Sequence, residues 1–293
     1  MAAELISRHQ SFVPGEPIEV ALRLNIIKHW HTYWRNPGDS GLPTKLKWTL
    51  PAGFTAGDIQ WPYPKKLPLG PLMNYGYEGE VLHLVTIKSP ANIKPGESAT
   101  FTAKADWLVC EDVCIPEEGT LTLTLPASAS MPEPNPSWAK AFSAATSALP
   151  STLLPNVIAN IDAQTLRLNV KTDALGAIND ITFYPHRDDL VANAAKQIFT
   201  KTADGFTLDV TLIEPRNNDL STLDGILVAN NAAWGAVINA NANANANAKA
   251  VTIAAPVSYA AGVNGNANSS VGAPLQAKLP ESAQPGLSLI TAL

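Results

Sequence analysis

The first 126 residues are dominated by short runs that alternate apolar and polar side chains and end at Pro-Gly turns. Such runs occupy residues 18–24, 45–50, 81–87, 100–108 and 119–125, and Pro-Gly pairs stand at 14–15 and 95–96. Alternation with period two buries one face of a strand, and closely spaced turns connect neighbouring strands in antiparallel order. The pattern predicts an all-β fold, an antiparallel β-sandwich, over residues 1–126.

The remaining 167 residues divide into three further segments by composition. Residues 127–155 are rich in Pro, Ala and Ser and are predicted to be a connection containing one short helix with Ser137 as its N-cap. Residues 156–255 contain strand-like runs at 165–170, 178–184, 206–212 and 225–228, which predict a second, smaller β-sandwich. An Asn-Ala repeat at 239–248 and the Ala/Gly/Asn/Ser/Pro-rich residues 256–293 predict a loop and a flexible tether.

Composition and charge exclude several classes of protein. Only 15% of the residues are charged and 24 are proline, which disfavours a helical bundle. The net charge is −5 and no Lys/Arg stripe is visible, so a nucleic-acid partner is not expected. The sequence contains no run of about 18 apolar residues, the length that a helix needs to span a bilayer. The start lacks the pattern of a signal peptide, which fits either a cytosolic protein or numbering that begins after a removed export signal.

The chain has two cysteines, Cys110 and Cys114, and they are separated by three residues. A zinc site needs about four ligands, and the nearest histidines, His29 and His31, are distant in sequence. A disulfide closing so small a ring stabilises a fold by about 2 kcal/mol, against about 5 kcal/mol for a loop of about 100 residues. The short ring therefore favours a bond that is made and broken, with a structural staple and a metal site as alternatives.

Acidic residues crowd the cysteine pair, and no Lys or Arg follows Lys104 up to residue 126. They are Asp106, Glu111, Asp112, Glu117 and Glu118. Local negative charge disfavours a thiolate, so the free chain is predicted to be a slow nucleophile that becomes competent when a partner docks.

Four segments together make residues 10–126 similar to a known family. They are residues 29–43 (His-Trp-His-Thr-Tyr-Trp-Arg-Asn-Pro-Gly-Asp-Ser-Gly-Leu-Pro), 61–64 (Trp-Pro-Tyr-Pro), 74–79 (Asn-Tyr-Gly-Tyr-Glu-Gly) and the cysteine segment. The chain resembles the N-terminal periplasmic domain of the DsbD family of protein-disulfide reductases, with a closer likeness to the ScsB-type members linked to copper tolerance. Known members place more residues between their cysteines than this chain does.

The resemblance implies an immunoglobulin-like antiparallel β-sandwich and a thiol–disulfide oxidoreductase that cycles Cys110 and Cys114 between dithiol and disulfide. It implies that reducing equivalents pass from a membrane-embedded unit to thioredoxin-like periplasmic partners, with Cys114 the better candidate for the sulfur that joins the partner. It also places the domain in the periplasm, tethered to the inner membrane. Residues 284–293 stop as an apolar run begins, which fits either a membrane unit that follows Leu293 or a frayed apolar tail.

Family members shield the cysteine pair with an aromatic cap loop, and the matching stretch is 73–77. Tyr75 is the best candidate for the shield, Tyr77 is the second, and Asn74 occupies a position where a bulky aromatic is typical. The alternative is that both tyrosines only pack a hairpin. His31 and Tyr33 match a strand that approaches the pair; alternatively, they form an exposed edge.

Two other functions compete with the oxidoreductase. One is a non-catalytic protein-binding β-sandwich with a static disulfide, and the other is a copper-binding domain that uses the cysteines with His29 or His31. The leading hypothesis needs no cofactor, no bound metal and no small-molecule substrate, since thiol–disulfide exchange takes place between protein sulfurs.

Overall fold

A computed structural model describes residues 1–260 except 174, 214–219 and 235–248. The Asn-Ala repeat at 239–248 and most of the predicted tether lie outside the described residues. Within the described part, strand β18 (Ala250–Tyr259) continues past Pro256, where the sequence predicted that the tether begins. Pro256 is tolerated there because it lies opposite Thr222 near the end of the pairing with the neighbouring strand.

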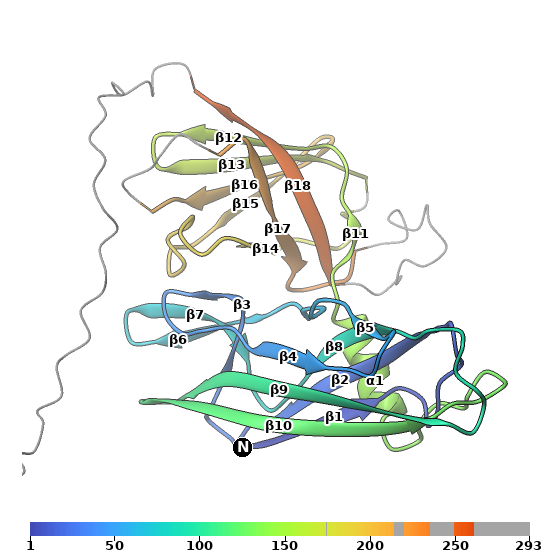
Figure 1. Cartoon of the computed structure of the whole chain (residues 1–293). Coiled ribbons are helices and arrows are strands. Elements are labelled where there is room, and N and C mark those ends of the chain that lie inside the picture. Colours follow the sequence, from blue (N-terminus) through green and yellow to red (C-terminus); the bar gives the residue numbers. More distant parts are fainter. Residues whose placement is uncertain (174, 214–219, 235–248, 261–293) are drawn as a thin grey trace, which may run out of the picture. The chain divides into compact units, whose positions relative to one another are not determined.

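The first region, residues 1–126, contains two antiparallel sheets that form a sandwich (Figure 1). The first sheet has the order β1-β2-β8-β5, and the second has the order β10-β9-β4. Their strands are β1 (Ala2–Ser7), β2 (Pro17–Asn25), β4 (Lys45–Thr49), β5 (Thr55–Ala56), β8 (Glu80–Lys88), β9 (Ser98–Cys110) and β10 (Cys114–Pro126). The prediction of an immunoglobulin-like, all-β fold is confirmed.

The long hairpin β9–β10 shows why this sequence folds as a sandwich. Along β9, odd-numbered residues such as Phe101 and Ala103 are fully buried, whereas Ser98, Thr100 and Lys104 on the other face are exposed. Phe101 packs against Phe54, with ring centroids 5.2 Å apart, in a core that also contains Val20 and Ile87. Each such buried side chain contributes about 1.5–3 kcal/mol to folding.

A third small sheet, of order β3-β7-β6, leads from the sandwich toward the cysteines. Its strands are β3 (Thr32–Gly38), β6 (Lys65–Leu69) and β7 (Leu72–Tyr77). Just before β3, His31 forms an isolated bridge with Cys110 at the end of β9. The start of this sheet therefore lies at the tip of the β9–β10 hairpin.

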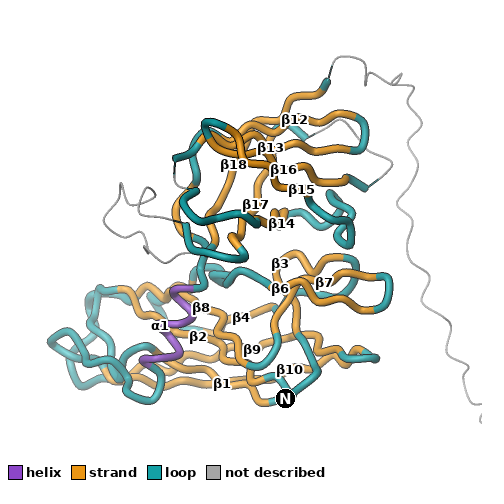
Figure 2. Tube along the Cα trace, turned by 180° about the vertical axis from the view of Figure 1, so that it is seen from behind, coloured by secondary structure: helices purple, strands orange, loops and turns teal. Residues whose placement is uncertain are grey.

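The one helix of the described residues, α1 (Ala139–Ser147), packs Phe142 and Ala145 against Leu82 and Leu84 of β8 (Figure 2). The predicted helix is present, but the prediction of Ser137 as its N-cap is wrong. Trp138 occupies the cap position and makes no side-chain cap hydrogen bond. The helix is held by burial of its apolar face, which outweighs a missing cap of about 1 kcal/mol.

The second region begins at β11 and ends with β18. It contains one core between two layers of strands, and β18 pairs with strands of both layers. Residues 250–256 of β18 pair with β17, and residues 257–259 pair in parallel with β12. Side chains of both layers, such as Leu168 and Phe183, meet in a single buried cluster. The strands are β11 (Ser151–Leu153), β12 (Val157–Asp162), β13 (Thr165–Lys171), β14 (Ile181–Pro185), β15 (Ile198–Thr202), β16 (Gly205–Thr211) and β17 (Thr222–Ala229).

Candidate functional site

Cys110 and Cys114 face each other across the tip of the β9–β10 hairpin. Cys110 is the last residue of β9 and Cys114 the first of β10, their Cα atoms are 4.1 Å apart, and their sulfurs form a disulfide. The three intervening residues form a turn in which the Glu111 N–H donates to the Val113 carbonyl at 3.1 Å. The register of the hairpin thus holds the two sulfurs within bonding distance.

The two cysteines differ in their exposure to solvent. Cys110 is fully buried, and its backbone exchanges two hydrogen bonds of 2.9 and 3.0 Å with His31. Cys114, at the open edge of the hairpin tip, is exposed. The exposed member of the pair is therefore Cys114.

Tyr33 is the aromatic side chain that meets the disulfide. Its hydroxyl lies 3.7 Å from the sulfur of Cys114, and its ring is fully buried. The His31 ring packs edge-on against it, with centroids 5.1 Å apart, so both side chains lie on the same side of the strand. Burial raises the pKa of Tyr33 and lowers the pKa of His31, which keeps both groups neutral at pH 7.

A loop at residues 39–43 covers the outer side of the Tyr33 ring. An added Cβ at Gly41 would lie 2.1 Å from the Tyr33 ring, so the backbone rests directly on it. The loop is fastened to β7: Asn74 Oδ1 accepts from the backbone and hydroxyl of Ser40 at 3.2 and 2.9 Å. Asp39 accepts from the Met73 N–H at 2.7 Å. Sequence reasoning missed this covering role, although the Pro-Gly-Asp-Ser-Gly run shows a tight turn there.

Substituting Gly41→Ala is expected to displace the Tyr33 ring and destabilise the fold by about 2–4 kcal/mol. The cost combines overpacking with the positive φ of 103° at this residue. Gly70→Ala is the matched control, because Gly70 also has a positive φ (58°) but nothing lies within 4 Å of its added Cβ. Urea unfolding of both variants checks this; equal losses would contradict the contact between the loop and the ring.

The residues of the predicted cap lie in β7 of the hairpin β6–β7. Tyr75 is fully buried, with its ring centroid 4.8 Å from that of Tyr184, and the Tyr77 hydroxyl donates to the Pro62 carbonyl at 2.7 Å. Asn74 is buried and holds the covering loop as described. Tyr75 thus packs against β14 and Tyr77 bonds to residue 62, whereas Tyr33 places its hydroxyl beside the Cys114 sulfur.

Residues of the second region contact β3, the strand that contains Tyr33, through hydrogen bonds and ring packing. The Asn36 amide donates to the carbonyls of Pro185 and Arg187 at 2.8 and 3.0 Å, and Trp34 packs edge-on against Tyr184. Asn193 donates to Asp39 of the covering loop at 2.7 Å. Residues distant in sequence thereby fix β3 and the loop beside the disulfide.

Three of the five acidic residues near the cysteines are engaged by other groups. The indole N–H of Trp107 donates to Glu117 at 3.1 Å, and Lys104 contacts Glu118 at 2.8 Å and Asp106 at 3.8 Å. These three side chains lie along the hairpin and not at the sulfurs. The acidic character at the sulfurs themselves thus comes from the turn between the cysteines.

Within the described part of the chain, no group of three or more His, Cys, Asp or Glu side chains converges as a metal site. His29, one of the two proposed copper ligands, is exposed in a turn ahead of β3. Among the same residues, no helix is long and apolar enough to cross a membrane.

The fold and the cysteine pair together define a class: a β-sandwich with a cross-strand disulfide at a hairpin tip. Residues 2–126 belong to the family of the N-terminal domain of thiol:disulfide interchange protein DsbD, whose model matches them. No curated protein matches the chain.

Solved structures add a likeness in fold. The N-terminal periplasmic domain of ScsB from Proteus mirabilis is 15% identical with a TM-score of 0.58, covering 86% of this chain and 91% of that one. The periplasmic chaperone SfaE, 11% identical over 88% of this chain and all of its own, has a TM-score of 0.22, too low to carry an argument. The ScsB domain therefore shares its architecture with both regions of this chain.

Proposed function

We propose that this chain relays reducing equivalents from a membrane-embedded donor to thioredoxin-like proteins of the periplasm, through Cys110 and Cys114. The observation that carries the proposal is the asymmetry of the pair: Cys114, an exposed residue, is bonded to Cys110, which is fully buried. A partner therefore has one sulfur to attack, and the second sulfur is held beside it to complete the exchange.

The reduced pair would deliver two electrons in two displacements. The Cys114 thiolate attacks the disulfide of the partner, forms a mixed disulfide and releases one partner thiolate, which takes up a proton. The Cys110 thiolate then attacks the Cys114 sulfur, which re-forms the Cys110–Cys114 disulfide and releases the second partner thiolate. The partner disulfide is reduced, and the chain is oxidised. Reaction with the thiols of the donor reverses both steps and regenerates the dithiol.

Tyr33 and the covering loop would limit access to the sulfur of Cys114. The Tyr33 ring occupies one side of that sulfur, and the loop at 39–43 holds the ring in place. An approaching thiolate has to align with the disulfide bond, so a ring beside the sulfur restricts the directions of attack. Such shielding would favour a docked partner over a small thiol.

The periplasmic location and the membrane-embedded donor rest on resemblance. The residues that match the DsbD family include the whole cysteine hairpin, and the ScsB domain of similar fold is described as periplasmic. An oxidising compartment suits a chain whose two cysteines form a disulfide.

Equilibration of the full chain with glutathione buffers tests the proposal. We expect exchange to reach equilibrium with a reduction potential above about −300 mV, as for disulfides that are catalytic and not structural. A potential well below about −300 mV, with no exchange, would establish the static disulfide of a protein-binding sandwich instead.

A further inference from the structure

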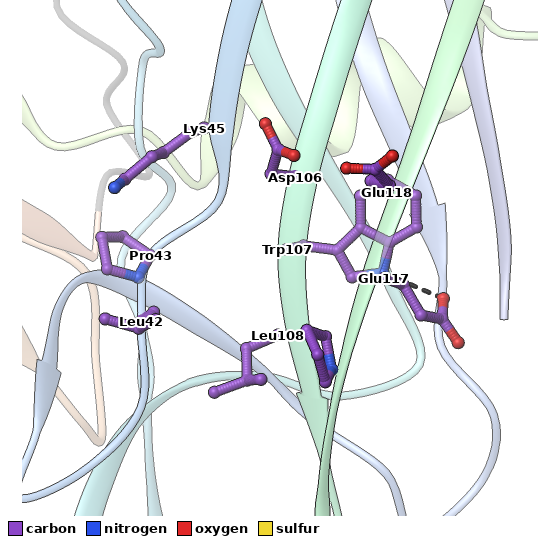
Figure 3. A pocket seen from close by; sticks show the side chains of 9 residues that line it. Leu42, Pro43, Lys45, Asp106, Trp107, Leu108, Glu117 and Glu118 are labelled. Carbon is purple, nitrogen blue, oxygen red and sulfur yellow. Dashed lines mark hydrogen bonds between the residues drawn. The ribbon is translucent and has the colours of Figure 1, made fainter. Parts of the chain in front are cut away.

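A groove lies along the β9–β10 hairpin (Figure 3). It has a volume of about 380 Å³ and lies between residues 42–45 and the hairpin. Its apolar lining comes from Leu42, Pro43, Trp107, Leu108 and Pro116.

Four of the hairpin residues that line the groove lie on the same face of the hairpin as the disulfide. Cys114 lies opposite Cys110, Pro116 opposite Leu108, and Glu118 opposite Asp106. Since alternate residues of a strand point to the same side, these three pairs form a ladder on one face. The groove begins at the Leu108–Pro116 pair, which is the next pair on this face after the cysteines and lies about 7 Å along the strand.

Exposed apolar side chains extend from the groove toward the hairpin tip. Leu42 is 61% exposed, and Val113, in the turn between the cysteines, is 62% exposed. Pro116, between them, is also exposed. Apolar side chains gathered at a reactive sulfur mark a surface that a partner covers.

The charge on the rim of this surface is negative. Asp106, Glu117 and Glu118 line the groove with Lys45 as the basic member, and the turn adds Glu111 and Asp112. Lys104 contacts Glu118 and Asp106, and the amino group of Met1 lies 3.6 Å from Glu117, so the five carboxylates face three cationic groups and the surface keeps a net negative charge. The surface therefore complements an apolar side chain flanked by basic groups.

We propose that the groove binds the segment flanking the reactive cysteine of the thiol partner, in extended form. This segment carries an apolar side chain two to four residues from its cysteine and a basic residue beyond. Two to four residues of extended chain span about 7–13 Å, which matches the distance along β10 from Cys114 to Pro116 and to Glu118. The proposal rests on the proposed function, because it names the chemistry of the partner for the same sulfur.

Synthetic peptides with one cysteine test the groove. The first has the order lysine, phenylalanine, serine, cysteine, serine, phenylalanine, lysine; a second replaces phenylalanine by serine, and a third replaces lysine by glutamate. Mixed-disulfide formation with the oxidised full chain is followed by mass spectrometry. Each rate constant is divided by that peptide's rate with glutathione disulfide, which removes differences in thiol reactivity.

The first peptide is expected to react about 10-fold faster than either of the others on this scale. Leu42→Ser and Pro116→Ser remove the preference for phenylalanine, and Glu118→Lys removes the preference for lysine. Ile198→Ser, an exposed apolar residue of β15, keeps both preferences as the matched control.

Two results would overturn the proposal that the groove binds the partner segment. One is equal normalised rates for the three peptides, and the other is a phenylalanine preference that persists in Leu42→Ser and Pro116→Ser. In that case exchange with glutathione still supports the proposed function. Failure of every thiol, glutathione included, to open the disulfide would overturn both proposals.

Discussion

The Cys110→Ser variant is expected to react with a thiol reagent about 100-fold faster than the Cys114→Ser variant. The first leaves the exposed Cys114 thiol, and the second leaves the fully buried Cys110 thiol. Reaction of a buried thiol requires local opening, and an opening free energy of about 2.7 kcal/mol corresponds to a factor of 100. The measurement is the rate of reaction with an aromatic disulfide reagent under native conditions.

The two variants are each other's control, because both lose the same disulfide, worth about 2 kcal/mol. In the presence of denaturant the two rates should converge, which shows that folding and not intrinsic chemistry separates them. Equal rates in the native state would contradict the asymmetry on which the assignment of Cys114 depends. Neither variant can cycle between dithiol and disulfide, so both lose relay activity completely.

Acidification from pH 7 to pH 5 is expected to lower the free energy of unfolding by about 2 kcal/mol through His83 alone. His83, in β8, is fully buried, and neither ring nitrogen has a hydrogen-bond partner among the described residues. Its ring packs edge-on against Trp61 and Tyr77. Burial lowers its pKa to about 3, from 6.5 in an exposed chain.

The sign follows from which state binds the proton first. Below pH 6.5 the unfolded chain binds a proton on His83, whereas the folded chain binds it only near pH 3. Stability is therefore complete above pH 6.5 and is lost as the pH falls toward 3. His31 and His186 act in the same direction, because burial lowers the pKa of both.

Urea unfolding at pH 7 and pH 5 measures the effect. His83→Phe keeps an aromatic ring without a titrating group, so the difference between the two pH values should shrink by about 2 kcal/mol. His29→Gln, at an exposed position, should keep the wild-type difference. An unchanged difference in His83→Phe would mean that His83 is not buried in the neutral form.

The strands of the sandwich could be predicted because their pattern is local. Alternation in 100–108 and 119–125 identifies one buried face of β9 and β10, and the structure places a strand over each. The nearness of the two sulfurs also follows from sequence, because three residues form a hairpin turn. The family likeness over residues 10–126 is confirmed by the match to residues 2–126.

The family resemblance pointed to Tyr33 as a neighbour of the cysteine pair, but the contacts that hold Tyr33 in place could not be predicted because they join distant residues. Tyr33 is held by Gly41 on one side and, through Asn36, by the carbonyl of Pro185 about 150 positions away. Tyr75 looked like the shield because it stands in the matching stretch, but the structure turns its ring toward Tyr184. Periodicity specifies the face of a strand, and tertiary packing decides which side chain meets the sulfur.

The most direct test of the account is to identify the cysteine that joins a partner. The oxidised full chain is mixed with a reduced thioredoxin whose second active-site cysteine is serine, so that the mixed disulfide accumulates. After alkylation and digestion, mass spectrometry should find the thioredoxin peptide joined to Cys114 and Cys110 carrying the alkyl group. A conjugate through Cys110, or an intact Cys110–Cys114 disulfide with no conjugate, would contradict the account.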